Sequence, residues 1–265
     1  MGTEVWINEV GQSRLPAKVM SIWILKWITR KTKMISQYSN YGKSQMFPSG
    51  SQACGGVLID DRDGEAYNTV MIGDQCWMAE NLNVGTMITS NGSGDNQTDN
   101  GILEKYCYDN NTINCDEYGG LYQWEEAMQY TTIEGTQGIC PDGWHLPSDG
   151  EFCTLATFLD PTVTCTGTGL RGADAGGKMK EMGTDHWLNP NNGATNESGF
   201  TGMPGAYRYY NGYFDYLGYY GYYWQSTDYG SDHYYWYMAF NSEQVGRHTT
   251  PFGFGFSVRC VKNSQ

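Results

Sequence analysis

The cysteines constrain this sequence more than any other feature. There are eight of them, all after residue 50, and no two form a CxxC pair. The four histidines are scattered without the spacing of metal ligands. We therefore expect no structural metal and no cofactor. An even number of cysteines instead favours disulfides in a secreted or cell-surface protein over free buried thiols.

Charge is divided unevenly along the chain. Residues 1–50 carry seven Lys or Arg against two Glu, a balance of +5, whereas residues 51–265 carry nine Lys or Arg against 27 Asp or Glu, a balance of −18. A body this acidic repels phosphate backbones, so nucleic acid is not expected as a partner. We predict a basic N-terminal extension over 1–50, poorly structured or dispensable, and a single domain over 51–265.

An apolar run inside the extension raises the question of a leader or a membrane span. The run extends from Val19 to Leu25, is interrupted by Lys26 and is followed by further basic residues. It is too short, and too basic downstream, for a transmembrane helix. A poor signal-peptide core and an upstream extension or fusion remnant both stay open, and no clear signal peptide is recognised.

Glycine and aromatic residues dominate the composition of the chain. It has 35 Gly and 15% aromatic residues but only 17% charged residues, which is typical of strands and turns rather than helices. Two short strands, 57–59 and 67–72, are predicted to form a hairpin around Asp60–Gly64. The aspartates of this turn resemble the start of a calcium loop, but the glutamate needed near its end is missing, so a plain hairpin is favoured.

Two short helices are predicted in the middle of the chain. The first covers 121–130, with apolar and polar side chains on opposite faces. The second begins after Ser148, which forms a capping box with Glu151. Its inward residues are expected to be Phe152, Leu155, Phe158 and Leu159.

A Tyr-rich region covers 205–250, where 13 of the 21 tyrosines lie between Tyr207 and Tyr237. Residues 234–241 alternate, so successive side chains are expected on opposite faces of a strand. The buried set is expected to be Tyr234, Trp236, Met238 and Phe240. The displayed set is expected to be Tyr235, Tyr237, Ala239 and Asn241. Residues 252–260 also alternate, which predicts a nine-residue strand with Cys260 inward and Arg259 outward.

Long motifs through most of the chain resemble the Fibrobacter succinogenes major paralogous domain. They are DGEAYNTVMIGDQCWMAENLN (63–83), YCYDNNTINCDEYGGLYQWEEAM (106–128), GICPDGWHLPSDGEF (138–152), GFTGMPGAYR (199–208), GYYWQST (221–227) and GFSVRCV (255–261). The resemblance implies an α+β, C-type-lectin-like fold, with two short helices, a twisted antiparallel sheet and much irregular loop. It also implies an exported protein distantly related to formylglycine-generating oxidases.

The same fold is similar to that of proteins diversified by retroelements, whose variable positions are rich in Tyr, Asp, Ser, His and Gly. Residues 207–250 use that set of residue types, so a hypervariable binding region is one reading of this segment. The calcium-binding sugar motifs of the fold, Glu-Pro-Asn and Trp-Asn-Asp, are missing from the sequence. Calcium-dependent lectin activity is therefore not expected.

The cysteine pairing is predicted from loop lengths. Cys107–Cys115 and Cys153–Cys165 each close a short loop with turn residues. Cys140–Cys260 joins the third motif to the last strand, and Cys54–Cys76 is the remaining pair. Eight cysteines allow about 105 pairings, so this assignment is one of many.

Ligand binding through exposed tyrosines is the favoured function, because tyrosine combines a rigid contact area with a hydroxyl group, as in antibody paratopes. The candidate residues are Tyr209, Tyr210, Tyr213, Asp215, Tyr216, Tyr219, Tyr235, Tyr237 and His248. The expected ligand is a protein or glycan. The alternative is a structural cell-surface or fibre protein that assembles with itself. An oxidase is less favoured, because the cysteines look structural, and no hydrolase or phosphate-binding motif is present, so no catalytic residue is assigned.

Overall fold

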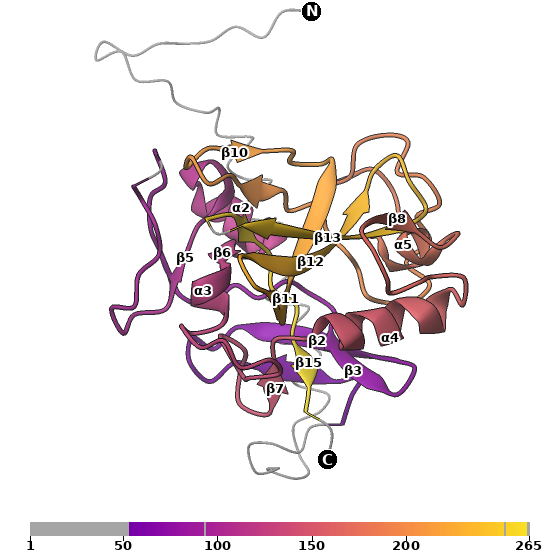
Figure 1. Cartoon of the computed structure of the whole chain (residues 1–265), viewed down its shortest axis with the longest axis horizontal. Coiled ribbons are helices and arrows are strands. Elements are labelled where there is room, and N and C mark those ends of the chain that lie inside the picture. The colour runs from indigo at the N-terminus through magenta and orange to yellow at the C-terminus, as the bar shows by residue number, and fades with distance from the viewer. Residues whose placement is uncertain (1–52, 93, 252, 264–265) are drawn as a thin grey trace, which may run out of the picture. The chain divides into compact units, whose positions relative to one another are not determined.

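Short strands make up most of the regular secondary structure of the described chain (Figure 1). The computed structural model describes residues 53–92, 94–251 and 253–263. The predicted extension over 1–50 lies outside these residues. In chain order the elements are β1 (Val57–Ile59), β2 (Ala66–Ile72), β3 (Gln75–Met78), β4 (Thr86–Met87), β5 (Glu104–Lys105), the 3-10 helix η1 (Tyr108–Asn110), α2 (Thr112–Tyr118), β6 (Tyr122–Gln123), α3 (Trp124–Ala127), β7 (Trp144–His145), α4 (Asp149–Leu159), β8 (Gly169–Arg171), α5 (Ala175–Met179), β9 (Tyr207–Arg208), β10 (Phe214–Asp215), β11 (Tyr220–Tyr229), β12 (Asp232–Ala239), β13 (Val245–Pro251), β14 (Gly255–Phe256) and β15 (Val261–Lys262).

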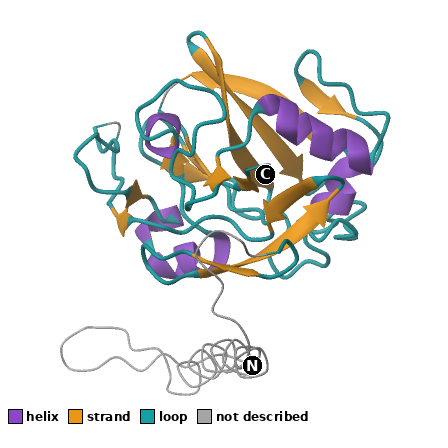
Figure 2. Cartoon of the chain, turned by 90° about the horizontal axis from the view of Figure 1, so that it is seen from below, coloured by secondary structure: helices purple, strands orange, loops and turns teal. Residues whose placement is uncertain are grey.

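The strands form three antiparallel sheets and one small parallel pair. The sheet orders are β1-β2-β3-β15-β7, β11-β12-β13-β8 and β10-β9-β14-β6, and β4 pairs with β5 in parallel. Strands occupy the centre of the described part, with helices around them (Figure 2). Antiparallel sheet with a few short helices places the domain in the α+β or mainly-β class, which confirms the prediction at that level.

The predicted hairpin is present at the start of the described chain. Strand β1 pairs with β2 in the register Val57 to Asn68. In the turn, the Asp60 carboxylate accepts hydrogen bonds from the Arg62 side chain at 2.6 and 2.8 Å. The Gly64 N–H donates to the Asp60 carbonyl at 2.7 Å. The aspartate therefore organises the turn through Arg62.

The helices match the predictions in part. The Ser148–Glu151 capping box is present at the start of α4. Phe158 was expected inside but is 62% exposed, because its ring packs over Gly73 in the β2–β3 turn at the protein surface. The predicted helix over 121–130 is reduced to α3, because Tyr122 and Gln123 form β6 and Gln129 and Tyr130 adopt left-handed backbone angles. Helices α2 and α5 were not predicted.

The predicted nine-residue strand at 252–260 is wrong. Phe252 lies outside the described residues. Among the described residues 253–260 only β14 is regular, and Ser257 and Arg259, which were expected to face outward, are buried. The Arg259 guanidinium donates to Asn81 Oδ1 at 2.6 and 3.1 Å and to the Met78 carbonyl at 3.2 Å. Burial lowers the Arg259 pKa. This segment runs through the interior with both of its sides covered. The alternation of apolar and polar residues therefore does not separate an exposed face from a buried one.

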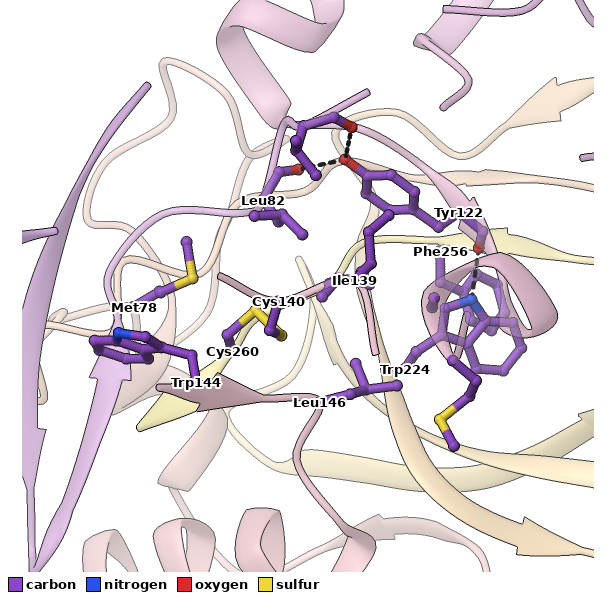
Figure 3. Packing of buried hydrophobic residues seen from close by; sticks show 14 of the residues in the cluster. Met78, Leu82, Tyr122, Ile139, Cys140, Trp144, Leu146, Trp224, Phe256 and Cys260 are labelled. Atoms are coloured by element: carbon purple, nitrogen blue, oxygen red, sulfur yellow. Dashed lines mark hydrogen bonds between the residues drawn. A yellow bond between two sulfur atoms is a disulfide. The ribbon is translucent and has the colours of Figure 1, made fainter. Parts of the chain in front are cut away.

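Two hydrophobic clusters form the core. The first contains Met78, Leu82, Tyr122, Leu146 and Trp224 among others, and lies around the Cys140–Cys260 disulfide (Figure 3). In it, Trp224 Nε1 donates to the Tyr122 carbonyl at 2.7 Å. The second cluster packs α4 and α5 against one face of the β11-β12-β13-β8 sheet. Its members include Phe152, Ala175, Trp187, Tyr223, Trp236, Met238 and Val245.

All eight cysteines form disulfides. The pairs are Cys54–Cys76, Cys107–Cys115, Cys140–Cys260 and Cys153–Cys165, which are the four pairs expected from the sequence. They are consistent with an extracellular or surface protein. Among the described residues, none of the helices has the length and apolar character needed to cross a bilayer.

Candidate ligand-binding face

The hairpin of β11 and β12 determines which tyrosines lie together. Tyr222 pairs with Tyr237, Trp224 with Tyr235, and Tyr235 in turn with His248 on β13. Because successive strand residues point to opposite faces, this register sorts the aromatic residues into two sets. One set is Tyr223, Trp236, Met238 and Val245. The other is Tyr220, Tyr222, Trp224, Tyr235, Tyr237 and His248.

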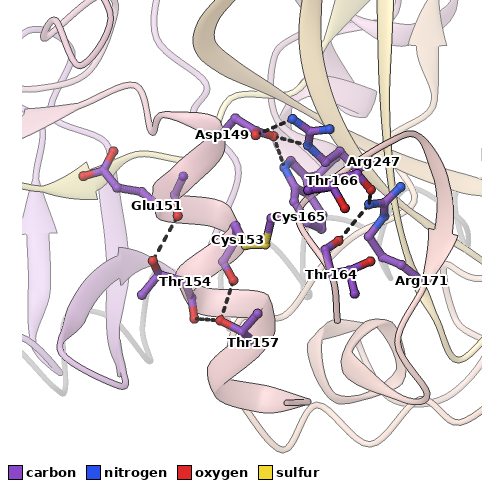
Figure 4. The surroundings of a disulfide bond; sticks show 12 residues. Asp149, Glu151, Cys153, Thr154, Thr157, Thr164, Cys165, Thr166, Arg171 and Arg247 are labelled. Carbon is purple, nitrogen blue, oxygen red and sulfur yellow. Dashed lines mark hydrogen bonds and ion pairs between the residues drawn. A yellow bond between two sulfur atoms is a disulfide. The ribbon is translucent and has the colours of Figure 1, made fainter. Parts of the chain in front are cut away.

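The first set faces α4 and is fixed by a buried ion pair. Arg247 donates to both oxygens of Asp149 at 2.6 and 2.7 Å, and Trp236 Nε1 donates to Asp149 Oδ1 at 2.8 Å (Figure 4). The Cys153–Cys165 disulfide lies beside this pair and ties α4 to the segment before β8. Trp236 stacks on Phe152 with ring centroids 5.1 Å apart. This face is therefore closed by a helix, a disulfide and a charge network.

The second set forms the floor of a ring cluster that we call the aromatic face. Its inner rings, which are half-buried, are Tyr207, Tyr222, Tyr235, Tyr237 and Phe254. Its outer tyrosines are Tyr210, Tyr213, Tyr216 and Tyr219. Residues Tyr209, Tyr220 and His248 complete it.

Ring contacts connect the inner rings to the core below and to the outer tyrosines above. Tyr222 stacks on buried Phe256 at 5.0 Å, and Tyr235 packs on the same ring at 4.9 Å. Tyr207 lies 5.5 Å from Tyr222 and 5.6 Å from Tyr216. Burial raises the pKa of Tyr207 to about 12 and raises the pKa values of Tyr222 and Tyr235 as well. These hydroxyls are neutral at physiological pH.

The structure exposes the outer tyrosines most. Tyr210, Tyr213, Tyr216 and Tyr219 are 51%, 65%, 40% and 41% exposed. Asp215 and His248, also predicted site residues, are exposed too. Tyr209 is half-buried between Tyr210 and Phe254.

Tyr235 and Tyr237 differ from the expectation of full display. They lie on the face opposite Trp236, as alternation predicts, but both are half-buried. Tyr235 packs between Phe256 and His248. Tyr237 lies over Gly246 on β13, so closely that a Cβ at Gly246 would overlap its ring. Neighbouring aromatic residues thus cover much of what the strand pattern would leave open.

A buried arginine holds the loops that carry the outer tyrosines. Arg208 is fully buried and donates to Ser90 Oγ at 2.7 Å and to the carbonyls of Asp95 and Gly253 at 2.9 and 3.0 Å. Its guanidinium lies 4.6 Å from the centre of the Tyr106 ring. One side chain therefore fixes segments 90–95, 207–209 and 253 relative to one another.

A close backbone contact strengthens this arrangement. Ser90 Oγ donates to the Gly212 carbonyl at 2.8 Å, and a Cβ at Gly212 would overlap the backbone of Gly92. Gly212 also has φ 90°, a left-handed conformation that favours glycine. The turn at 209–213 closes through the Tyr209 N–H and the Tyr213 carbonyl, which lie 2.7 Å apart. The outer tyrosines are therefore carried on ordered loops.

Charge around the aromatic face has one sign. Within 205–251 the two basic side chains, Arg208 and Arg247, are both buried. The exposed acidic residues there are Asp215, Asp228 and Glu243. Of these, Asp215 adjoins the aromatic face, where its carboxylate accepts a hydrogen bond from the Tyr216 N–H at 2.8 Å.

A second polar site lies in a depression of about 410 Å³ lined by Glu134, His145, Ser148, Glu151 and Asn263. Glu151 lies between the other two functional groups: its Oε1 is 2.8 Å from His145 Nε2, and its Oε2 accepts from Ser148 Oγ at 2.9 Å. The hydrogen bond and charge of Glu151 raise the His145 pKa against the opposing effect of burial. Ser148 and Glu151 bond to each other as a helix cap. The Ser148 hydroxyl is bonded to Glu151 and not to His145, so histidine is not placed as a base for this serine.

Sequence reasoning missed several residues of this face. Tyr207, Tyr220, Tyr222 and Arg208 were not among the candidates. Alternation at 220–224 matches that at 234–241 and could have placed Tyr220 and Tyr222 beside Tyr237. The role of Arg208 has no local signal, because its partners Ser90 and Asp95 lie more than 110 residues away.

The comparisons with known proteins agree with the motif analysis. Residues 70–262 match the model of the Fibrobacter succinogenes major domain. Comparison with curated proteins and with solved structures gave no match. The matched segment begins within β2 and ends in β15, and it contains the second hydrophobic cluster, the first cluster except Tyr67, and the whole aromatic face. The chain therefore belongs to the Fibrobacter succinogenes major domain family.

Proposed function

We propose that this chain is an extracellular or surface-displayed binding domain that recognises a protein or glycan through its aromatic face. In this proposal the fold is C-type-lectin-like and the domain is not an enzyme. The four disulfides support the location. The arrangement of Ser148, Glu151 and His145 as a helix cap supports the absence of catalysis at that depression.

The observation that carries the proposal is the exposure of four tyrosines on a fixed support. A monomeric domain rarely leaves contiguous aromatic surface open without a use for it. Here Tyr216 rests on the inner ring Tyr207 and Tyr210 packs against Phe254, while Arg208 holds the start of the loop that carries Tyr210 and Tyr213. Because their loops are already ordered, little conformational entropy is lost when a ligand binds.

Diversification of this face is a finer part of the proposal. The outer tyrosines and Asp215 can change without emptying the core, because the packing of the fold depends on other residues. Sequencing the locus in sibling cells tests this directly. Clustered adenine substitutions in codons 207–250 would support a retroelement-diversified binder, and an invariant segment would contradict it.

The binding test compares the full chain with a variant carrying Tyr210→Ser, Tyr213→Ser, Tyr216→Ser and Tyr219→Ser. Both are screened against a glycan array and a displayed peptide library. We expect ligands of the wild type to bind the variant at least about 30-fold more weakly, since central aromatic anchors contribute on the order of 2 kcal/mol.

Tyr229→Ser is the matched control, because Tyr229 is 63% exposed but contacts Tyr234, which lies on the opposite face of the hairpin. It should leave binding unchanged. Equal losses in the control and the fourfold variant would contradict the proposed face. Concentration-dependent oligomers that the fourfold variant abolishes would support self-assembly instead.

A further inference from the structure

We propose that the ligand of the aromatic face is a polypeptide segment bearing Arg or Lys side chains. This inference rests on the proposed function and names the chemistry of its ligand. The cationic groups would lie against the faces of the outer tyrosines and pair with Asp215 and its acidic neighbours.

The charge pattern extends beyond the Tyr-rich region. Tyr108 in η1 packs against Phe214 of β10 with ring centroids 5.5 Å apart. Its pKa is raised by burial and also by the charges of Asp109 and Asp215, which both lie close to it. Asp109 and Asp215 are exposed. The Asp215 carboxylate accepts a hydrogen bond from the N–H of the outer tyrosine Tyr216 at 2.8 Å, so a negative charge lies directly beside that residue.

Among the described residues, the basic side chains that adjoin η1 and β10 in the sheet or in the sequence, Arg208 and Lys105, already have partners. Arg208 is buried with its bonds made to Ser90, Asp95 and Gly253. Lys105 donates to the side chain of Asn83 at 2.9 Å. An anionic ligand would therefore meet unscreened carboxylates, whereas a cationic ligand would relieve their repulsion.

Ring geometry favours separate side chains over a flat sugar chain. Tyr216 is nearly perpendicular to Tyr219 at 88° and to Tyr220 at 79°. Tyr219 meets Phe240 at 80°. Rings at right angles offer no common plane for stacking successive pyranose units, but each can hold a cation on its own face.

The fold itself places arginines over tyrosine rings, and two of these pairs are close. Arg247 lies 4.0 Å above the Tyr234 ring, and Arg208 lies 4.6 Å above the Tyr106 ring. Both distances are within the range in which a guanidinium is attracted to an aromatic ring. In the Arg247–Tyr234 pair the guanidinium also contacts the Asp149 carboxylate, and exposed Tyr216 beside Asp215 offers a ligand the same combination of a ring face and a nearby negative charge.

The test uses a synthetic (Gly-Arg)6 peptide, a (Gly-Glu)6 peptide and cellohexaose, titrated by calorimetry into the full chain at about 0.15 M salt, where distant charges are screened. We expect binding of (Gly-Arg)6 alone. Tyr213→Ser with Tyr216→Ser should weaken it at least 10-fold, and Asp215→Asn should weaken it about 3-fold. Melting temperatures of the variants should match the wild type.

Asp61→Asn is the matched control for charge, because Asp61 is exposed in the turn between β1 and β2. It should change the affinity less than Asp215→Asn. Equal effects of the two substitutions would show attraction to net charge and would overturn the inference. So would failure of (Gly-Arg)6 to bind. Binding of cellohexaose that is lost with the two tyrosines would overturn this inference while leaving the proposed function standing.

Discussion

The two faces of the β11–β12–β13 sheet carry similar residues in different surroundings. Tyr223 and Trp236 are covered by α4 and fixed by the Asp149–Arg247 pair. Tyr222 and Tyr235, on the opposite face, are covered by Phe256 and by other tyrosines. The first face ends in a closed core and the second ends in exposed rings. Aromatic content alone therefore does not decide whether a ring is structural; the element that covers it does.

The comparison also explains the role of the half-buried residues. Tyr235 and Tyr237 belong neither to the core nor to the open surface, since each contacts the inner rings and retains partial exposure. Their rings therefore contribute both to the stability of the sheet and to the shape of the aromatic face. Substitutions on the two faces should accordingly give a graded series of effects, from the closed core to the outer tyrosines.

The largest effect should come from Trp236→Ala on the core face. Trp236 is fully buried and bonded to Asp149, so the substitution leaves a cavity and removes a partner of a buried carboxylate. The free energy of unfolding should fall by about 3–5 kcal/mol. Denaturant titration measures it. A loss of unfolding free energy below about 1 kcal/mol would contradict the assignment of the Trp236 face as the closed core.

Tyr235→Ser should have an intermediate effect, which the strand pattern alone would not predict. Its ring contacts Phe256, Tyr222 and His248, and removing it uncovers part of the first hydrophobic cluster. We expect a loss of about 2 kcal/mol in the same titration. An unchanged stability would mean that the ring is displayed, as the sequence suggested.

Gly246→Ala tests the contact between β13 and Tyr237. A new Cβ would overlap the Tyr237 ring, so the ring must move and about 1 kcal/mol should be lost. The loss should disappear when Gly246→Ala is made together with Tyr237→Ser. A double-mutant cycle gives the coupling, and additive effects would contradict the contact.

Local patterns in the sequence predicted the parts of this fold whose causes are local. The capping box at Ser148 and the alternation at 234–241 each depend on residues close in the chain. The capping box is present, and the alternation placed Trp236 and Met238 on the face opposite Tyr235 and Tyr237, but Ala239, expected to be displayed, is buried. The disulfide pairs also agree with the predicted set. Family membership followed from long motifs and is confirmed by the family match.

The errors arise where tertiary contacts override the local pattern. Arg259 is buried because Asn81, 178 residues away, accepts its hydrogen bonds. Phe158 is exposed because its ring packs against Gly73 at the protein surface. Tyr207 and Tyr222 were missed because their contacts depend on Phe254 and Phe256, which lie more than 30 residues further along the chain. No window of sequence contains these partners together.

The smallest effect on stability is expected for the outer tyrosines, and it tests the central claim most directly. The measurement is the free energy of unfolding of the fourfold variant Tyr210→Ser, Tyr213→Ser, Tyr216→Ser and Tyr219→Ser. Each residue is at least 40% exposed, so the four changes together should alter stability by about 1 kcal/mol or less. A loss above about 4 kcal/mol would show that these rings hold the fold together and would contradict their assignment as a displayed recognition surface.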